Sequence, residues 1–429
     1  MKTFIEPSRS EWPAITSRPV LDNESLVGKV SEVLEAVRKT GDQAVRQFTQ
    51  TFDGVNLSEF TLSEQAWADG ENQVSEKLKS AIQQAAQNIE SFHKHQVQDM
   101  PPVETQPGVL CWRKSVGIEK VGLYIPGGSA PLFSTILMLG IPARLAGCKQ
   151  VVLCSPPDKE GKLNPAILYA AKLVGIHQVF KIGGVQAIGA MAYGTQSVPK
   201  VHKIFGPGNQ YVTAAKALVQ QTGTAIDMPA GPSEVLVLAD DSANPVFVAA
   251  DLLSQAEHGP DSQSLLITTS KEMANAVEKE VLQQLEDLPR KAIASRALQH
   301  SKLIVVKSMD EAIELSNIYA PEHLILCVTD PEMVAAGIIN AGSVFLGHYS
   351  PESVGDYASG TNHTLPTNGY ATAYSGVSLD SFVRKITFQK LSVQGLAAIA
   401  DTVITMAEAE GLHAHALAVS RRLDQPAIK

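Results

Sequence analysis

With 429 residues, the chain is long enough for two or more domains. Hydrophobic residues make up 44% of it and charged residues 18%, which is ordinary for a compact protein. The 35 basic and 44 acidic side chains leave a net charge of −9. Nucleic acids and anionic membranes favour basic surfaces, so this charge argues against either of them as a partner.

The composition also predicts a reducing compartment. The four cysteines form no CxxC pair, which argues against structural disulfides and against a thiolate zinc site. The first residues hold an early acid and a proline without an apolar core, unlike a secretory signal. The longest apolar stretch, residues 130–143, is too short to span a bilayer. We therefore expect a cytoplasmic protein.

The N-terminal part of the chain is predicted to be helical over residues 24–53 and 73–95. Apolar side chains recur at helical spacing in the second of these segments. His93 and His95 lie where that helix becomes polar, and we expect both side chains at the surface.

From residue 119 onward, short apolar runs that are typical of strands alternate with helical segments. The first block has predicted strands at 120–128, 150–154, 178–184 and 201–208. Its predicted helices are 134–148, 165–174, 186–193 and 209–221. Strands that alternate with helices at this rhythm indicate a parallel sheet with helices on its faces.

A second block repeats the alternation. Its predicted strands are 234–239, 264–268, 302–306 and 343–346. Its predicted helices are 245–258, 273–285 and 309–318. The end of the chain, residues 392–423, is predicted to be helical with a break at Gly411. The fold class is therefore α/β with two units and a helical C-terminal extension.

Three glycine-bearing turns follow predicted strands of the first block, where α/β sheets often bind ligands. They are Pro126–Gly128, Gly183–Gly184 and Gly206–Gly208, and none has the G-x-G-x-x-G dinucleotide pattern. Gln186 and Asn209 each open a helix just after such a turn, as caps or as amides that meet a nucleotide. Tyr124 ends a strand, where its ring can stack on a ligand. Tight turns without a ligand are the alternative.

The helix predicted from Pro245 ends in polar side chains. Gln255 and His258 are three residues apart, so both project from one helical face. Gly259 and Pro260 then stop the helix. An amide and an imidazole at this place are typical of part of a ligand set, and a capped, solvated helix end is the alternative.

Two further segments hold candidate chemistry. Glu322 and His323 are adjacent after an apolar helix, and both side-chain types can act as a general base near neutral pH. A surface pair is the alternative. The segment 350–363 is polar and glycine-rich, which is typical of functional loops. In it, Asp356 is a candidate metal ligand and His363 a candidate substrate contact, unless both serve only caps and turns.

The last candidate group lies near the C-terminus. Glu410 and His413 are three residues apart on one face, and spacing does not choose between His413 and His415 as a ligand. An exposed helix start is the alternative. The separated segments together offer an amide, imidazoles and a carboxylate without a thiolate. Such a set suits Zn²⁺ or a similar first-row ion in a site that stays open for substrate.

At these residues the chain resembles the bacterial histidinol dehydrogenase family over essentially its whole length. The segments that carry the resemblance are GLYIPGGSAP (122–131), FGPGN (205–209), DMPAGPSE (227–234), LSQAEHGPDSQ (253–263), PEHL (321–324) and SVGDYASGTNH (353–363). Together they are very specific, although each alone is not. The family completes histidine biosynthesis by oxidising L-histidinol to L-histidine through the aldehyde, with two NAD⁺ used in turn at one zinc site.

The resemblance implies a role for each candidate residue, and the sequence keeps the family pattern at all of them. The implied zinc ligands are Gln255, His258, Asp356 and His415, the last from the partner subunit of a homodimer. The implied acid–base pair is Glu322 and His323. The implied substrate contacts outside these two sets are Ser233, His363 and Glu410. The implied NAD contacts are Tyr124, Gln186 and Asn209.

The resemblance also implies a domain plan of the aldehyde dehydrogenase type, with two related, incomplete Rossmann-like units. The expected segments are an N-terminal arm (1–22), a first, discontinuous α/β domain (23–122 and 234–376), a second, NAD-contacting α/β domain (123–233) and a helical dimerisation segment (377–429).

The chemistry that the resemblance implies agrees with the residue types. Zinc would hold the amino and imidazole nitrogens of the substrate. His323 would take the alcohol proton, and Glu322 would activate water to attack the aldehyde, which stays in one water-controlled site. A metal-dependent hydrolase with the same ligands would turn over without nicotinamide. A nucleotide-binding protein without catalysis would have no need of Glu322, His323 and four ligands.

Overall fold

The computed structural model describes residues 1–18, 23–97, 100–127, 131–229 and 231–424. The chain forms two compact units. Unit 1 consists of Met1–Gln96 and Ile118–Phe382, and unit 2 of Val97–Gly117 and Val383–Lys429. Parts of the predicted N-terminal arm and of the first and third resemblance motifs (residues 19–22, 128–130 and 230) lie outside the described residues. In the part of the chain that is described, no helix is long and apolar enough to cross a membrane.

Unit 1 contains a six-stranded parallel sheet built from the second predicted block. Its strands, in spatial order, are β1 (Lys2–Ile5), β11 (Lys302–Val305), β10 (Gln263–Thr268), β9 (Glu234–Ala239), β12 (His323–Cys327) and β13 (Ser343–Leu346). The four inner strands are buried along their whole length, as continuous apolar runs between two helix layers should be.

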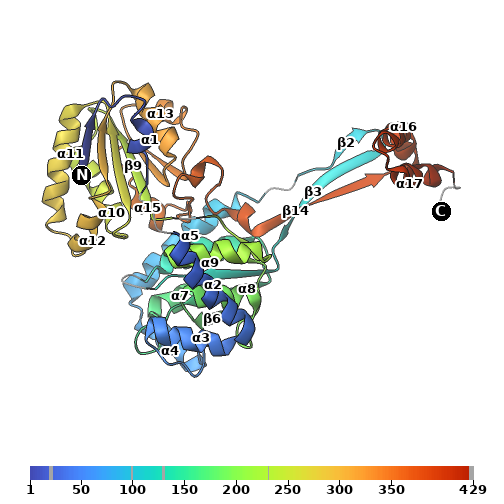
Figure 1. Cartoon of the computed structure of the whole chain (residues 1–429), viewed down its shortest axis with the longest axis horizontal. Coiled ribbons are helices and arrows are strands. Elements are labelled where there is room, and N and C mark those ends of the chain that lie inside the picture. Colours follow the sequence, from blue (N-terminus) through green and yellow to red (C-terminus); the bar gives the residue numbers. More distant parts are fainter. Residues whose placement is uncertain (19–22, 98–99, 128–130, 230, 425–429) are drawn as a thin grey trace. The chain divides into compact units, whose positions relative to one another are not determined.

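Helices cover both faces of the six-stranded sheet (Figure 1). One face packs on α10 (Pro245–Ala256), α11 (Lys271–Leu285) and α12 (Lys291–Ala297). The other face packs on α1 (Trp12–Ile15), α13 (Met309–Tyr319) and α14 (Pro331–Ala335). Asn244 accepts a hydrogen bond from the amide of Val246 and so caps the start of α10, with Pro245 in the first turn.

The first predicted block forms a separate five-stranded parallel sheet within unit 1. Its strands, in spatial order, are β6 (Gln178–Lys181), β5 (Gln150–Ser155), β4 (Lys120–Tyr124), β7 (Lys203–Phe205) and β8 (Ala225–Ile226). Its connecting helices are α6 (Phe133–Leu145), α7 (Pro165–Leu173), α8 (Gly184–Tyr193) and α9 (Gln210–Gln221). The two parallel sheets with their helices confirm the predicted α/β class.

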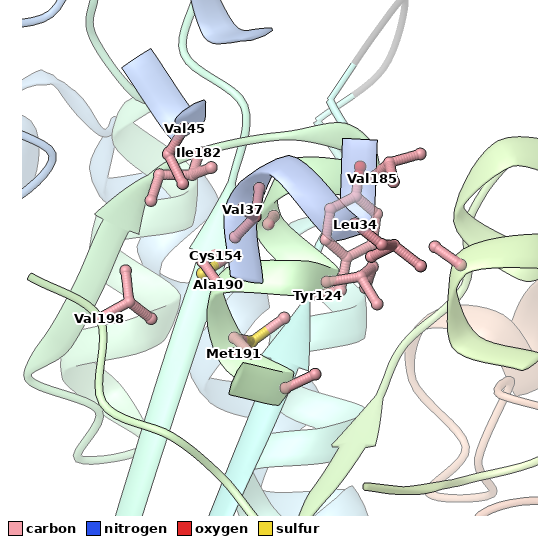
Figure 2. Close-up of a cluster of buried hydrophobic side chains, with 14 of the residues drawn as sticks. Leu34, Val37, Val45, Tyr124, Cys154, Ile182, Val185, Ala190, Met191 and Val198 are labelled. Carbon is pink, nitrogen blue, oxygen red and sulfur yellow. The ribbon is translucent and has the colours of Figure 1, made fainter. Parts of the chain in front are cut away.

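The helices near the N-terminus pack against the five-stranded sheet. They are α2 (Asn23–Thr40), α3 (Asp42–Phe48), a π-helix (Thr49–Asp53), α4 (Glu64–Gln73) and α5 (Glu76–Lys94). Figure 2 shows Leu34 and Val37 of α2 in one apolar cluster with Val185 and Met191 of α8 and with Tyr124. On the other face, Ile82 and Ile89 of α5 join a second cluster that includes α6.

This packing corrects the predicted domain plan. We expected residues 23–122 to form one domain with 234–376, but their buried side chains share cores with the sheet of residues 120–226. Helical periodicity tells which face of a helix is buried and not which sheet covers it. The prediction that His93 lies at the surface is also wrong, because its ring is fully buried and bonds the carbonyl of Ile89 at 2.9 Å.

Unit 2 is an antiparallel ribbon followed by two helices (Figure 1). The ribbon pairs β14 (Val383–Leu391) with β3 (Val109–Gly117), and β3 with β2 (Val103–Gln106). The helices are α16 (Val393–Ala409) and α17 (His413–Leu423). The predicted break at Gly411 is confirmed, since its φ of +75° suits glycine. The segment 377–429, expected to be a helical dimerisation segment, includes the strand β14, whose exposed and charged residues give no strand-like alternation.

Candidate active site

The acid–base candidates Glu322 and His323 stand at the start of a buried strand. They follow the helix α13, as expected, and His323 opens β12, a strand that was not predicted. His323 pairs in register with Val235 of β9 on one side and with Ser343 of β13 on the other. Both side chains are buried, which excludes the surface-pair alternative. They lie at the amino edge of the six-stranded sheet, whereas ligands of such sheets usually bind at the carboxyl edge.

Three carboxylates and a carbonyl surround the His323 ring. Nδ1 lies 3.2 Å from the carbonyl oxygen of Glu234 and 3.6 Å from a carboxylate oxygen of Glu322. A Glu352 oxygen is 3.9 Å from Nδ1, and an Asp356 oxygen is 3.5 Å from Nε2. Burial alone would lower the pKa of His323, but the neighbouring carboxylates raise it well above its usual value.

Glu322 is a buried carboxyl that accepts a backbone hydrogen bond. The backbone N–H of Glu234 donates to its Oε2 at 2.8 Å. Burial raises the pKa of Glu322 to about 8, against the smaller opposing effect of His323. A carboxyl with a pKa near neutrality can both accept and release a proton, as a general acid–base group must.

A metal-binding arrangement lies beside this pair. His258, Glu352 and Asp356 offer ligand atoms that all lie within 4.8 Å of one another. The two carboxylates are four residues apart on the short helix α15 (Glu352–Tyr357), so both project from one face of it. His258 follows the end of α10, where crowding by the surrounding chain lowers the pKa of its ring although the side chain is exposed.

Unsatisfied polar atoms show that this arrangement fits a cation. Among the described residues, both amide atoms of the fully buried Gln255 lack a hydrogen-bond partner, and so do Asp356 Oδ1 and Glu352 Oε2. Buried polar atoms are almost always satisfied, so these four need a ligand or water. Their nitrogen and oxygen chemistry suits Zn²⁺. The capped-helix alternative for Gln255 fails, because a cap would engage its amide.

Glu352 was not predicted, although the sequence carries a signal for it. It lies four residues before Asp356, the spacing of two carboxylates on one helical face. The pattern of residues 350–363 predicts a loop without regular structure, but α15 occupies part of this segment. Burial raises the pKa of Glu352 to about 8, which fits a carboxyl that stays neutral unless a positive charge approaches it.

Of the predicted substrate contacts, His363 lies next to Asp356. Its Nδ1 bonds the backbone carbonyl of Asp356 at 2.8 Å, and its Nε2 lies 3.0 Å from the hydroxyl of Thr135. Burial lowers the pKa of His363, so its ring is neutral near pH 7. Ser233 is half-buried and immediately precedes β9, the strand that Glu234 opens. The structure therefore groups both with the acid–base pair.

The remaining predicted contacts, Glu410 and His415, belong to unit 2. Glu410 follows the end of α16, and His413 and His415 are both exposed in the first turn of α17. The choice between these two histidines stays a prediction. Unit 1 supplies Gln255, His258 and Asp356, and the fourth ligand, His415 of a partner subunit, also stays a prediction.

The predicted NAD contacts gather at the carboxyl edge of the five-stranded sheet. A cavity of about 1210 Å³ lies there, and Tyr124 and Asn209 line it. Tyr124 is buried, and its hydroxyl accepts a hydrogen bond from the N–H of Gly184 at 3.0 Å. Asn209 accepts from the N–H groups of Tyr211 and Val212, so it caps α9 as one alternative proposed. A concave space at this edge is where open α/β sheets bind nucleotides.

Gln186 lies beneath this cavity and is fully buried. Its Nε2 donates to an oxygen of Asp53 at 3.3 Å, while its Oε1 has no partner among the described residues. Asp53 lines the cavity, and burial raises its pKa to about 6. Asp53 was not predicted, and no motif in the sequence marks it.

A buried ion pair holds the glycine turn beside the same cavity. The ammonium of Lys216 pairs with the carboxylate of Asp227. Lys216 also donates to the carbonyl of Gly206 at 2.9 Å, and Asp227 accepts from the N–H of Gly206 at 2.8 Å. A Cβ at Gly206 would meet the carbonyl oxygen of Tyr124 at 2.0 Å, and its φ is +127°. Only glycine lets the turn approach the end of β4 so closely.

Comparisons with known proteins agree over the whole chain. Residues 16–423 match the protein family described as Histidinol dehydrogenase. The chain is 60% identical to the histidinol dehydrogenase of Bacteroides thetaiotaomicron, over 99% of both proteins. It is 54% identical to that of Yersinia pestis, over 97% of this chain and 94% of the relative. The crystal structure of histidinol dehydrogenase from Elizabethkingia anophelis superposes with a TM-score of 0.97 at 56% identity, covering 99% of this chain and 98% of that one.

The chain belongs to the histidinol dehydrogenase family.

Membership in the histidinol dehydrogenase family confirms the predicted family and the predicted class of enzyme, an oxidoreductase. A dehydrogenase implies a nicotinamide cofactor, and the cavity at the carboxyl edge of the five-stranded sheet has room for one. The hydrolase alternative predicts turnover without nicotinamide and does not fit this family. Single-residue roles and the cytoplasmic location stay predictions.

Proposed function

We propose that the chain oxidises L-histidinol to L-histidine through L-histidinal, with two NAD⁺ and a zinc ion, as the last steps of histidine biosynthesis. One observation carries the proposal. The buried pair Glu322 and His323 lies beside three side chains that could bind a metal ion, those of His258, Glu352 and Asp356. The chain that carries this group belongs to the histidinol dehydrogenase family. An acid–base pair beside a metal site suits the oxidation of an alcohol and then of an aldehyde.

Zinc would be held by Gln255, His258 and Asp356 of one subunit and by His415 of another. The unsatisfied amide of Gln255 and the free Oδ1 of Asp356 support the first part. Glu352 adds a carboxylate that the family pattern did not predict. When bound, the ion supplies Lewis-acid chemistry and orients the carbinol carbon of the substrate for hydride transfer.

His323 would remove the alcohol proton as the first hydride leaves for NAD⁺. Nδ1–H donates to the carbonyl of Glu234, so Nε2 is the ring nitrogen left to exchange a proton with the substrate. Nε2 has no hydrogen-bond partner among the described residues and faces Asp356. It therefore points to the side where the proposed ligands gather.

Glu322 would activate the water that attacks the aldehyde, and the resulting diol would release the second hydride to a second NAD⁺. Its elevated pKa suits proton transfer near neutrality. Because the pair is buried, the surrounding protein would restrict the access of bulk water to the aldehyde. The reactive intermediate would then stay bound until the second oxidation. His363 and Ser233 would hold the substrate in the same pocket.

NAD⁺ would occupy the cavity lined by Tyr124 and Asn209, with Gln186 beneath it. The glycine turns that precede α8 and α9 place backbone N–H groups and helix N-termini at this cavity, which favours the negative pyrophosphate. The ring of Tyr124 offers a flat apolar surface, although its hydroxyl is already bonded to Gly184.

The enzyme would work as a homodimer joined through unit 2. Large apolar side chains are exposed on this unit, and exposed apolar surface supports an interaction role when it is contiguous. They include Ile386, Phe388, Val393, Met406, Leu412 and Leu417. Glu410 and His415 lie on the same unit, so dimerisation through it would bring both to the partner's site.

The metal proposal is tested by Asp356→Asn. Asparagine keeps the shape but loses the negative charge, so we expect zinc affinity to fall by at least about 10–100-fold, the range seen even for supporting residues of metal sites. Zinc content after dialysis, measured by atomic absorption, checks this. Asp330→Asn is the matched control, because Asp330 only caps α14 and asparagine caps as well. Equal zinc content in both variants would contradict the ligand assignment.

A further inference from the structure

We propose that Arg18, from the N-terminal arm, is a positioning residue for the Glu322–His323 pair and acts on it through Glu234. The inference rests on the proposed function, because it concerns the pair to which that function gives the acid–base role. Arg18 lies in none of the resemblance motifs, and Glu234 ends the motif of residues 227–234 without an implied role of its own. Arg18 contacts the side chain of Glu234, and the backbone of Glu234 contacts both Glu322 and His323.

The first step is the ion pair between Arg18 and Glu234. The guanidinium Nε donates to Glu234 Oε1 at 2.5 Å, and a terminal nitrogen donates to Oε2 at 2.8 Å. The side chain of Arg18 is 16% exposed and that of Glu234 3% exposed. Such a two-pronged, buried pair fixes the carboxylate in both distance and plane.

Other contacts fix the guanidinium itself. The same terminal nitrogen donates to the backbone carbonyl of Tyr319 at 2.6 Å. The guanidinium also lies over the Tyr319 ring, 4.0 Å from its centre, which is a cation–π contact. The Glu234 carboxylate has a further donor, the backbone N–H of Asn368, which lies 2.9 Å from Oε1. Arg18 therefore ties the arm and α13 to the Glu234 carboxylate, which Asn368 also holds.

The second step is the backbone of Glu234, which faces both members of the acid–base pair. Its N–H donates to Glu322 Oε2 at 2.8 Å, and its carbonyl oxygen lies 3.2 Å from His323 Nδ1. Glu234 opens β9, and the residue after it pairs in register with His323. A shift of residue 234 thus moves the hydrogen-bond partner of the carboxylate and that of the imidazole together.

Removal of Arg18 would leave the Glu234 carboxylate buried without its cation. An uncompensated buried charge is strongly unfavourable, so the start of β9 would rearrange to take up water or a proton. Arginine is specifically required, since it reaches both oxygens of Glu234 and the carbonyl of Tyr319 at once. A lysine offers only a single nitrogen to these acceptors.

A double-mutant cycle separates positioning from general destabilisation. The rate of NADH formation from histidinal is measured for the wild type, Arg18→Met, Glu322→Gln and the double variant. We expect Arg18→Met to lower kcat by about 10–100-fold, the cost of a small misplacement of a reacting group. In the Glu322→Gln background, the same substitution should change kcat by less than about threefold, since no base is left to position.

Lys302→Met is the matched control, because Lys302 is another buried cation that holds the same arm. Its ammonium donates to the backbone carbonyls of Ile15 and Ser17 rather than to Glu234. We expect this variant to unfold at a lower temperature while its kcat for histidinal stays within about threefold of wild type. If Arg18→Met gives little folded protein, Glu234→Gln and Arg18→Lys take its place in the cycle.

The outcomes are distinct. Coupling between position 18 and Glu322, with partial activity in Arg18→Lys, supports the inference. Equal fold losses from Arg18→Met in both backgrounds, or no loss in the wild-type background, would overturn it. Failure of the proposed function appears elsewhere in the cycle, as an unchanged histidinal rate in the Glu322→Gln single variant.

Discussion

Glu322→Gln is expected to lower the rate of histidinal oxidation by about 100–10,000-fold, the usual contribution of a general base. Glutamine keeps the volume and the acceptor for the Glu234 N–H, but it has no carboxylate to take a proton from water. The first oxidation uses His323 and should fall by less than about tenfold. Stopped-flow measurement of NADH, started separately from histidinol and from histidinal, resolves the two steps.

Glu314→Gln is the control for this substitution, because Glu314 on α13 is half-exposed and pairs with Arg9 at the surface. We expect it to leave both rates unchanged. In the Glu322→Gln enzyme, histidinal should accumulate when histidinol is the substrate. Equal slowing of both half-reactions would mean that Glu322 does not act at the aldehyde step in particular.

Mixing two inactive variants, His415→Asn and Gln255→Ala, should restore activity after subunit exchange. Each variant alone lacks a proposed ligand at every site. In a heterodimer, the site with an intact Gln255 receives an intact His415 from its partner, and the other site lacks both. Random exchange makes half of the dimers mixed, so we expect about a quarter of wild-type activity.

Exchange is verified by co-purification of the variants through different tags, and activity is measured on the mixed sample. His413→Asn serves as the control, since spacing alone did not choose between His413 and His415. We expect that variant to remain active on its own. No recovery in confirmed heterodimers would argue against a shared site, and an inactive His413→Asn would move the ligand role to His413.

The strand and helix alternation was predictable because it rests on local apolar patterns. Fully buried strands such as β9 and β10 are continuous apolar runs, and caps such as Asn209 and Asn244 mark helix starts. By contrast, β14 is exposed along most of its length and carries several charges, so no pattern marks it. The helices of residues 23–96 show their apolar faces, but their assignment to the five-stranded sheet depends on contacts distant in sequence.

Much of the candidate site was predictable from residue types and family motifs, and its environment was not. Gln255 and His258 stood out at a helix end, and the structure shows that the Gln255 amide is unsatisfied there. Glu322 and His323 looked like an ordinary adjacent pair until β12 buried both. The influence of Arg18 on them passes through Glu234, which is 216 positions away in sequence. No spacing rule covers a contact of that kind.

The most direct test of the central claim is the amount of NADH formed per histidinol consumed, with and without a zinc chelator. We expect two NADH for each histidinol, with no free aldehyde, and loss of all turnover on chelation that added zinc restores. One NADH per histidinol with accumulating histidinal, or full activity in the chelated enzyme, would contradict the account.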